Sequence, residues 1–126
     1  RGICALKPGV PGVSENIKVV SVVGRFLEHS RIYSFERPGK EPCIYIGSAD
    51  LMPRNLYNRV ELVTPIRDDR IRAELMDILD RSLADDMNAW DLDAEGDWSR
   101  RDGTEGRSVQ RELIERHAAR AADAGV

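Results

Sequence analysis

Apolar residues occur in short runs through the first half of the chain. The predicted strands are residues 2–6, 17–23, 31–35, 43–50 (with a break at Gly47) and 58–66. These runs are rich in Val, Ile and aromatic residues, which favour strands because their side chains pack well on a pleated surface. Pro and Gly mark a turn at 37–40. We therefore expect one sheet, formed by residues before about 66.

The second half of the chain has helical periodicity instead. From Asp68 onward, the apolar residues at helical spacing are Ile71, Leu75, Ile78, Leu79 and Leu83. This spacing predicts an amphipathic helix over 68–84, capped by Asp68, that covers one face of the sheet. The polar, Gly-rich segment 93–106 predicts a mobile loop, and a last helix is expected from Ser108. The order of elements indicates a single α/β domain.

Charge is distributed unevenly along the 126 residues. The net charge is −3, yet residues 1–60 carry nine Lys and Arg against five Asp and Glu, whereas residues 61–126 carry ten against seventeen. A basic half on an acidic protein indicates a local anion site, since general nucleic-acid binding normally needs a basic domain. Scattered solvated charge is the alternative at this point, and no nucleic-acid partner is expected.

The cysteines indicate the redox compartment of the protein, and the first residue indicates whether the sequence is part of a longer one. Cys4 and Cys43 have no CxxC spacing and no histidine pair beside them, so we expect buried thiols in a reducing, cytoplasmic compartment and no zinc site. No apolar run approaches the roughly 20 residues that span a bilayer. Because the sequence begins at Arg1 and not at Met, we expect a fragment of a longer protein.

Three segments are each expected to end a predicted strand with polar groups. These are EHSR at 28–31, GSAD at 47–50 and RNLYNRVE at 54–61. Strand ends bring side chains together, and histidine, arginine and a Gly-Ser pair suit phosphoryl chemistry. Two structural alternatives stay open: Arg59 pairs with Glu61 on one strand face, or Arg31 pairs with Asp50. A Walker-type phosphate loop is excluded, because GVPGV lacks the required pattern.

The order H-x-R, G-S-x-D and then E resembles a phospholipase D half-site, with Arg31 and Asp50 in place of the usual lysine and asparagine. Longer stretches resemble the C-terminal catalytic domain of bacterial polyphosphate kinase. They are RGICALKPGVPGVSENIKVVSVVGRFLEHSRIYSF and IYIGSADLMPRNLYNRVELVTPI, and the resemblance runs to about Trp90. It implies an α/β fold with a phospholipase D-like mixed sheet and flanking helices. Leu51 departs from the tryptophan that is usual in the family.

The resemblance implies a domain over 1–90, followed by a polar loop and helical tail over 91–126. It implies reversible transfer of the terminal phosphate of ATP to polyphosphate, with ATP or ADP and polyphosphate as partners and Mg²⁺ as cofactor. The phosphorylated histidine and the metal ligands are expected in a preceding domain, so no metal ligand is expected within this chain. The full-length enzyme is expected to be a homo-oligomer, cytoplasmic or membrane-associated, and the isolated chain is expected to be inactive.

The residue roles follow by carrying the family motifs onto this chain. His29 is implied as the catalytic residue, in contact with ATP phosphates, while Arg1 and Arg59 are implied as further ATP and phosphate contacts. Residues expected to shape the site are Arg31, Ser48, Asp50 and Glu61. Two alternative functions remain: a phospholipase D-like phosphodiesterase or nuclease half-site that self-associates, and a non-catalytic module that binds polyanions.

Overall fold

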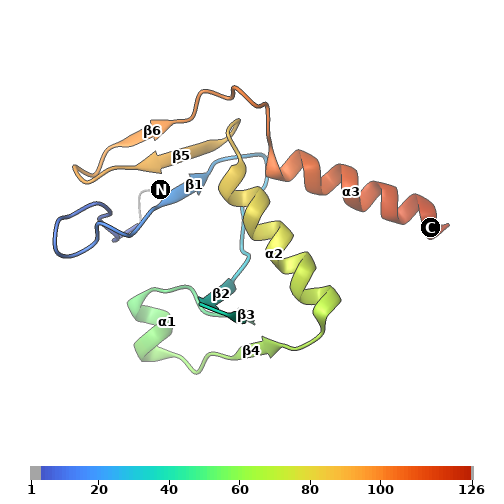
Figure 1. The fold of residues 1–126 in the computed structure, drawn as a ribbon, viewed down its shortest axis with the longest axis horizontal. Helices are drawn as coiled ribbons and strands as arrows, with labels where there is room; N and C mark the ends of the chain where they lie inside the picture. The colour runs from blue at the N-terminus through green and yellow to red at the C-terminus, as the bar shows by residue number, and fades with distance from the viewer. Residues whose placement is uncertain (1–3, 126) are drawn as a thin grey trace. The chain divides into compact units, whose positions relative to one another are not determined.

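The computed structural model describes residues 4–125, which divide into two compact units. Unit 2 is the segment Glu28–Asp80, and unit 1 combines the residues up to Leu27 with those from Arg81 onward. Figure 1 shows the helices and strands of both units along the chain. Each unit has its own sheet, and each is described separately below.

Unit 2 is built on an antiparallel three-stranded sheet. Its strands are β2 (Ile32–Arg37), β3 (Lys40–Gly47) and β4 (Val63–Ile66), with β3 in the centre. β2 and β3 form a hairpin around Pro38 and Gly39, and Gly39 has the positive φ of 69° that a tight turn requires of one of its residues. The predicted strands at 31–35 and 43–50 and the turn at 37–40 are thereby confirmed, including the break at Gly47.

Two helices accompany this sheet. The short helix α1 (Pro53–Asn58) starts at a proline, whose fixed φ suits the first turn of a helix. The long helix α2 (Asp69–Ala84) is capped as predicted, because Asp68 Oδ1 accepts a hydrogen bond of 3.0 Å from the Ile71 amide. Within unit 2, α2 packs on the sheet, where Ser34 Oγ lies 3.4 Å from Met76 Sδ. The central core residue is Ile44, which is only 2% exposed.

Unit 1 holds a second antiparallel sheet and the last helix. The strands are β1 (Val20–Val22), β5 (Ala89–Leu92) and β6 (Trp98–Arg100), in the order β1-β5-β6, and the helix is α3 (Val109–Asp123). Figure 1 shows β5 and β6 running side by side. The predicted helix from Ser108 is confirmed, although the α3 amide at Val109 is capped by Asp85 Oδ2 at 2.8 Å and not by Ser108.

Arg101 anchors the segment that follows β6. Its guanidinium donates to both carboxylate oxygens of Asp91, each at 2.8 Å, and to the main-chain oxygens of Leu83 and Asp85, each at 2.7 Å. The fork geometry of arginine allows all four bonds at once. They fasten residues 83, 85, 91 and 101 of unit 1 to one another.

The α/β class is confirmed, but the expected mixed sheet is not, because the strand pairs among residues 4–125 are all antiparallel. Several predicted elements also need correction. Residues 4–6 are not in a strand, whereas residues 2 and 3 lie outside the described part of the chain. Residues 59–62 are irregular and residue 58 ends α1, so β4 is shorter than the predicted strand 58–66. The expected loop 93–106 contains β6, because pairing with β5 outweighs its polar composition. β1 pairs with β5 and not with the sheet of unit 2, so residues 4–125 form two sheets where one was expected.

Two further observations concern the cysteines and the membrane. Cys4 is exposed and Cys43 half-buried, so the expectation of two buried thiols is wrong, and both thiols are free. None of the helices formed by residues 4–125 is long and apolar enough to cross a membrane.

Candidate active site

Three polar segments meet at one edge of the unit 2 sheet. The start of β2, the end of β3 and the start of β4 lie at the same edge because the strands are antiparallel, with Ile32 paired to Ile46 and Gly47 paired to Val63. The three segments named in the sequence are therefore brought together as expected. Only GSAD follows a strand end, whereas EHSR precedes β2 and RNLYNRVE forms α1 and the approach to β4.

Arg31 joins His29 to Asp50. Arg31 Nε and Nη2 donate to Asp50 Oδ1 at 3.0 and 2.7 Å, and Nη2 also lies 3.3 Å from His29 Nδ1. Arg31 Nη1 donates to the main-chain oxygen of His29. The hydrogen bond from Arg31 lowers the pKa of the Asp50 carboxyl, against a smaller opposing effect of desolvation. The alternative of an Arg31–Asp50 ion pair is thus present in the structure. Arg31 lies between Asp50 and His29, and the His29 ring is exposed.

Ser48 and Asn55 hold the carboxylate of Glu61. Ser48 Oγ donates to Glu61 Oε2 at 2.5 Å, and Asn55 Nδ2 donates to Glu61 Oε1 at 2.9 Å. These two hydrogen bonds, the Ser48 bond first, lower the pKa of Glu61, and the positive charge of Arg59 adds to the effect. Both oxygens of the carboxylate are occupied, so Glu61 orients Ser48 and is poorly suited to act as a base.

The turn after β3 is held from inside the unit. Tyr33 Oη donates to the main-chain oxygen of the buried residue Ala49 at 2.9 Å, and the Gly47 amide donates to the Arg31 oxygen at 3.0 Å. A Cβ at Gly47 would lie 3.2 Å from the Leu62 oxygen and 3.3 Å from the Tyr33 ring, which is tighter than most side-chain contacts. A side chain at position 47 would therefore press on the Leu62 oxygen and the Tyr33 ring, and the turn presents Ser48 and Asp50 beside them.

Arg59 lies in the irregular segment after α1 and is exposed. Within residues 4–125, no hydrogen bond or ion pair ties its guanidinium to Glu61, so the alternative of a direct Arg59–Glu61 pair is not realised. Its effect on Glu61 is through charge alone. The guanidinium is thus available to an anionic ligand. Arg1, the third predicted phosphate contact, lies outside the described residues.

Asn55 is a site residue for which the sequence indicates only a role in shaping the loop. It is 3% exposed, and its side chain reaches Glu61 from the first turn of α1. A buried amide needs hydrogen-bond partners, and Glu61 provides one. The signal in the sequence was the spacing of Asn55 and Glu61 in RNLYNRVE, of which residues 58–61 were predicted as strand. In the structure, residues 53–58 form α1 and residues 59–62 are irregular.

The described residues do not fit a metal site. Among residues 4–125, no group of three His, Cys, Asp or Glu side chains is arranged to hold a metal ion. At the sheet edge, the carboxylates of Asp50 and Glu61 are already engaged, the first by Arg31 and the second by Ser48 and Asn55.

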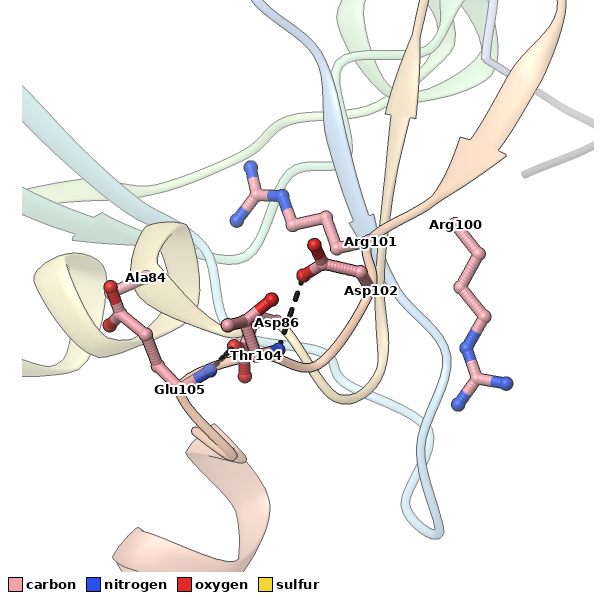
Figure 2. Close-up of a pocket in the computed structure, with 7 residues that line it drawn as sticks. All are labelled: Ala84, Asp86, Arg100, Arg101, Asp102, Thr104 and Glu105. Atoms are coloured by element: carbon pink, nitrogen blue, oxygen red, sulfur yellow. Dashed lines mark hydrogen bonds between the residues drawn. The ribbon is translucent and has the colours of Figure 1, made fainter.

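A surface pocket in unit 1 also gathers charged side chains (Figure 2). Its lining residues are Ala84, Asp86, Arg100, Arg101, Asp102, Thr104 and Glu105. Asp86 accepts hydrogen bonds from the Glu105 and Arg107 amides at 2.6 Å, Asp102 accepts from the Thr104 amide at 3.1 Å, and Arg101 is bound to Asp91. These groups order the loop before α3. Asp86, Arg101 and Asp102 are thus engaged within the unit, so the sheet edge of unit 2 is the better candidate site.

Comparison with known proteins identifies the family. The family model for polyphosphate kinase C-terminal domain 2 matches residues 1–112, beyond Trp90. Polyphosphate kinase 1 of Chlorobaculum tepidum is 50% identical over 99 residues, which are 79% of this chain and 14% of that protein. The polyphosphate kinase of Thermosynechococcus vestitus is 54% identical over 101 residues, 80% of this chain and 14% of the relative.

A solved structure agrees with the sequence comparisons. The crystal structure of polyphosphate kinase from Porphyromonas gingivalis has a TM-score of 0.85 and 35% identity, and the match covers 97% of this chain and 19% of that one. The chain thus spans a small part of the length of these relatives. The family model matches most of the chain, about one residue in two is identical to the Chlorobaculum and Thermosynechococcus proteins, and the fold is shared with the solved structure. The chain therefore belongs to the polyphosphate kinase C-terminal domain 2 family.

Proposed function

We propose that the protein containing this chain transfers the terminal phosphate of ATP reversibly to inorganic polyphosphate. The single observation that carries the proposal is the convergence of His29, Ser48 and Arg59 segments at one sheet edge of unit 2, in a chain of this family. In the proposal, the exposed His29 contacts the ATP phosphates, and the Arg59 guanidinium binds phosphate oxygens. Arg1 is a further nucleotide contact.

The covalent step of this proposal takes place on a histidine outside the chain. His29 has Arg31 at its Nδ1, whereas a nucleophilic histidine is usually supported there by a carboxylate or carbonyl acceptor. A role as hydrogen-bond donor to a phosphate oxygen suits this arrangement better than a role as nucleophile. Mg²⁺ remains part of the proposal as a charge-neutralising cofactor, with ligands outside residues 4–125.

Homo-oligomerisation and membrane association of the full-length enzyme are proposals from the family resemblance. Light scattering of the purified enzyme would measure its oligomeric state, and flotation with lipid vesicles would measure membrane binding. A monodisperse monomer that does not float with vesicles would contradict both proposals.

The decisive experiment is a transfer assay on the full-length protein and on the isolated 126-residue chain. Radiolabelled γ-phosphate from ATP should enter polyphosphate with the full-length protein, and none above background should enter with the chain alone, because no pair of nucleophile and base is assigned within it. Transfer by the isolated chain would refute the proposal that the covalent step takes place on a histidine outside the chain. Cleavage of a phosphodiester by the chain would favour the phospholipase D-like alternative, and polyphosphate binding without transfer by the full-length protein would favour a polyanion-binding module.

A further inference from the structure

His29 is exposed, and a free imidazole on an irregular segment would sample several rotamers and both neutral tautomers. Two contacts restrict it. Arg31 donates to the His29 main-chain oxygen, and Arg31 Nη2 lies 3.3 Å from His29 Nδ1. One guanidinium thus contacts both the backbone and the ring of the same residue.

Arg31 is itself fixed from two sides. Its main-chain oxygen accepts a hydrogen bond of 3.0 Å from the Gly47 amide, and its Nε and Nη2 are bound to Asp50 Oδ1. The Arg31 side chain is 23% exposed, so solvent competes little with these bonds. Asp50 therefore fixes the position of the Arg31 guanidinium, and the contacts of Arg31 with His29 depend on that position.

A guanidinium has only N–H donors and no acceptor. The ring nitrogen that faces it must therefore act as acceptor, which places the proton of a neutral His29 on Nε2. We propose that Arg31, held by Asp50, is a positioning residue that keeps the His29 ring in the Nε2–H tautomer and leaves Nε2–H as the donor to a substrate phosphate oxygen. This inference rests on the proposed function, in which His29 contacts phosphate.

Positioning through His29 and direct phosphate contact by Arg31 have different kinetic consequences. Arg31→Lys keeps the charge but cannot bond Asp50, the His29 oxygen and Nδ1 together, because lysine lacks the planar fork. In the full-length enzyme we expect Arg31→Lys and Asp50→Asn to lower kcat about tenfold, with KM for ATP and polyphosphate within about twofold. Arg54→Lys is the matched control, since Arg54 Nη2 lies 3.7 Å from Asp50 Oδ2, and it should leave kcat unchanged.

A double-mutant cycle separates the possibilities. In a His29→Ala background, Arg31→Lys should have no further effect, because a residue that acts only through His29 has nothing left to position. A tenfold loss that persists on top of His29→Ala, or a rise in KM, would overturn the inference while leaving the proposed function intact. If His29→Ala alone leaves the kinetics unchanged, the proposed role of His29 fails instead.

The tautomer gives a readout independent of turnover. In ¹⁵N-histidine-labelled full-length enzyme, the His29 signals are identified by their loss in His29→Ala. We expect the neutral ring to have a protonated Nε2 and an unprotonated Nδ1 in the wild type, and a mixture of tautomers in Arg31→Lys. Circular dichroism and thermal melting confirm that each variant is folded. A mixture of tautomers in the folded wild-type enzyme would overturn the proposal.

Discussion

Ser48 and Glu61 are hydrogen-bonded at 2.5 Å although they lie 13 residues apart in the chain. The bond closes the turn after β3 onto the segment that leads into β4, and Asn55 completes it from α1. The Leu62 amide and oxygen also contact Ser48, at 3.4 and 3.2 Å. Ser48 is therefore held by both its main chain and its side chain.

Glu61→Gln should make the stability of the chain less dependent on pH. The pKa of Glu61 lies below its ordinary value of 4.5 in the folded state. Such a carboxyl stabilises the fold above its unfolded pKa and loses that contribution as the pH falls through the folded pKa. We expect the urea midpoints of wild type and Glu61→Gln to differ at pH 7 and to converge below pH 4.5. Glu36→Gln, at an exposed position on β2, is the control and should leave the urea midpoint at pH 7 unchanged.

His29→Ala in the full-length enzyme should lower kcat by about 10²–10³, the usual cost of losing one hydrogen-bond donor to developing charge. The fold should survive, because His29 is exposed and lies outside the core. Steady-state kinetics with a melting curve provide the measurement. A folded variant with unchanged kcat and KM would remove His29 from the site.

Arg59→Ala should instead weaken the binding of ATP and polyphosphate together. A fixed positive charge acts on ground state and transition state alike, so KM should rise more than kcat falls. Arg70→Ala, on the exposed start of α2, serves as a charge-matched control. Equal kinetics for the two variants would argue against phosphate binding by Arg59.

Arg101→Ala should destabilise unit 1 by about 1–3 kcal/mol. This expected loss is kept small because the Arg101 and Asp91 side chains are 25% and 49% exposed, so water screens their interaction. The substitution removes four hydrogen bonds and leaves two main-chain oxygens and the Asp91 carboxylate without their donor. Arg100→Ala is the neighbouring control, since Arg100 donates to the Met87 oxygen from an exposed position. Urea unfolding followed by circular dichroism should separate the two variants, and equal midpoints would contradict the anchoring role of Arg101.

Gly24→Ala should also destabilise unit 1, through Gln110. A Cβ at Gly24 would lie 2.5 Å from Gln110 Oε1, yet the amide of Gln110 is bonded to the Phe26 amide and oxygen at 3.0 and 2.9 Å. Moving the side chain breaks those bonds, at a cost of about 1–2 kcal/mol. In a Gln110→Ala background, Gly24→Ala should be close to neutral in urea unfolding. A full effect in that background would show that the cause lies elsewhere.

Local sequence patterns determined the elements whose stability depends on neighbouring residues in the chain. The spacing of Ile71, Leu75 and Leu83 with the cap at Asp68 was sufficient for α2, because a helix bonds residues four apart. The hairpin of β2 and β3 was equally readable, since Pro38 and Gly39 form its turn. The motifs also identified the three segments that meet at the sheet edge.

Tertiary structure alone decided which strands pair and which polar groups meet. β1 pairs with β5 from far along the chain, with Val20 opposite Asp91, and periodicity carries no information on a partner so distant. Pairing with β5 likewise turned a polar segment into β6. At the site, the sequence placed Arg31 two residues from His29, but the contact of its guanidinium with Nδ1 exists because the turn after β3 brings Asp50 to Arg31. Hydrogen bonds between distant side chains are set by the backbone geometry of the folded sheet, and no local pattern specifies that geometry.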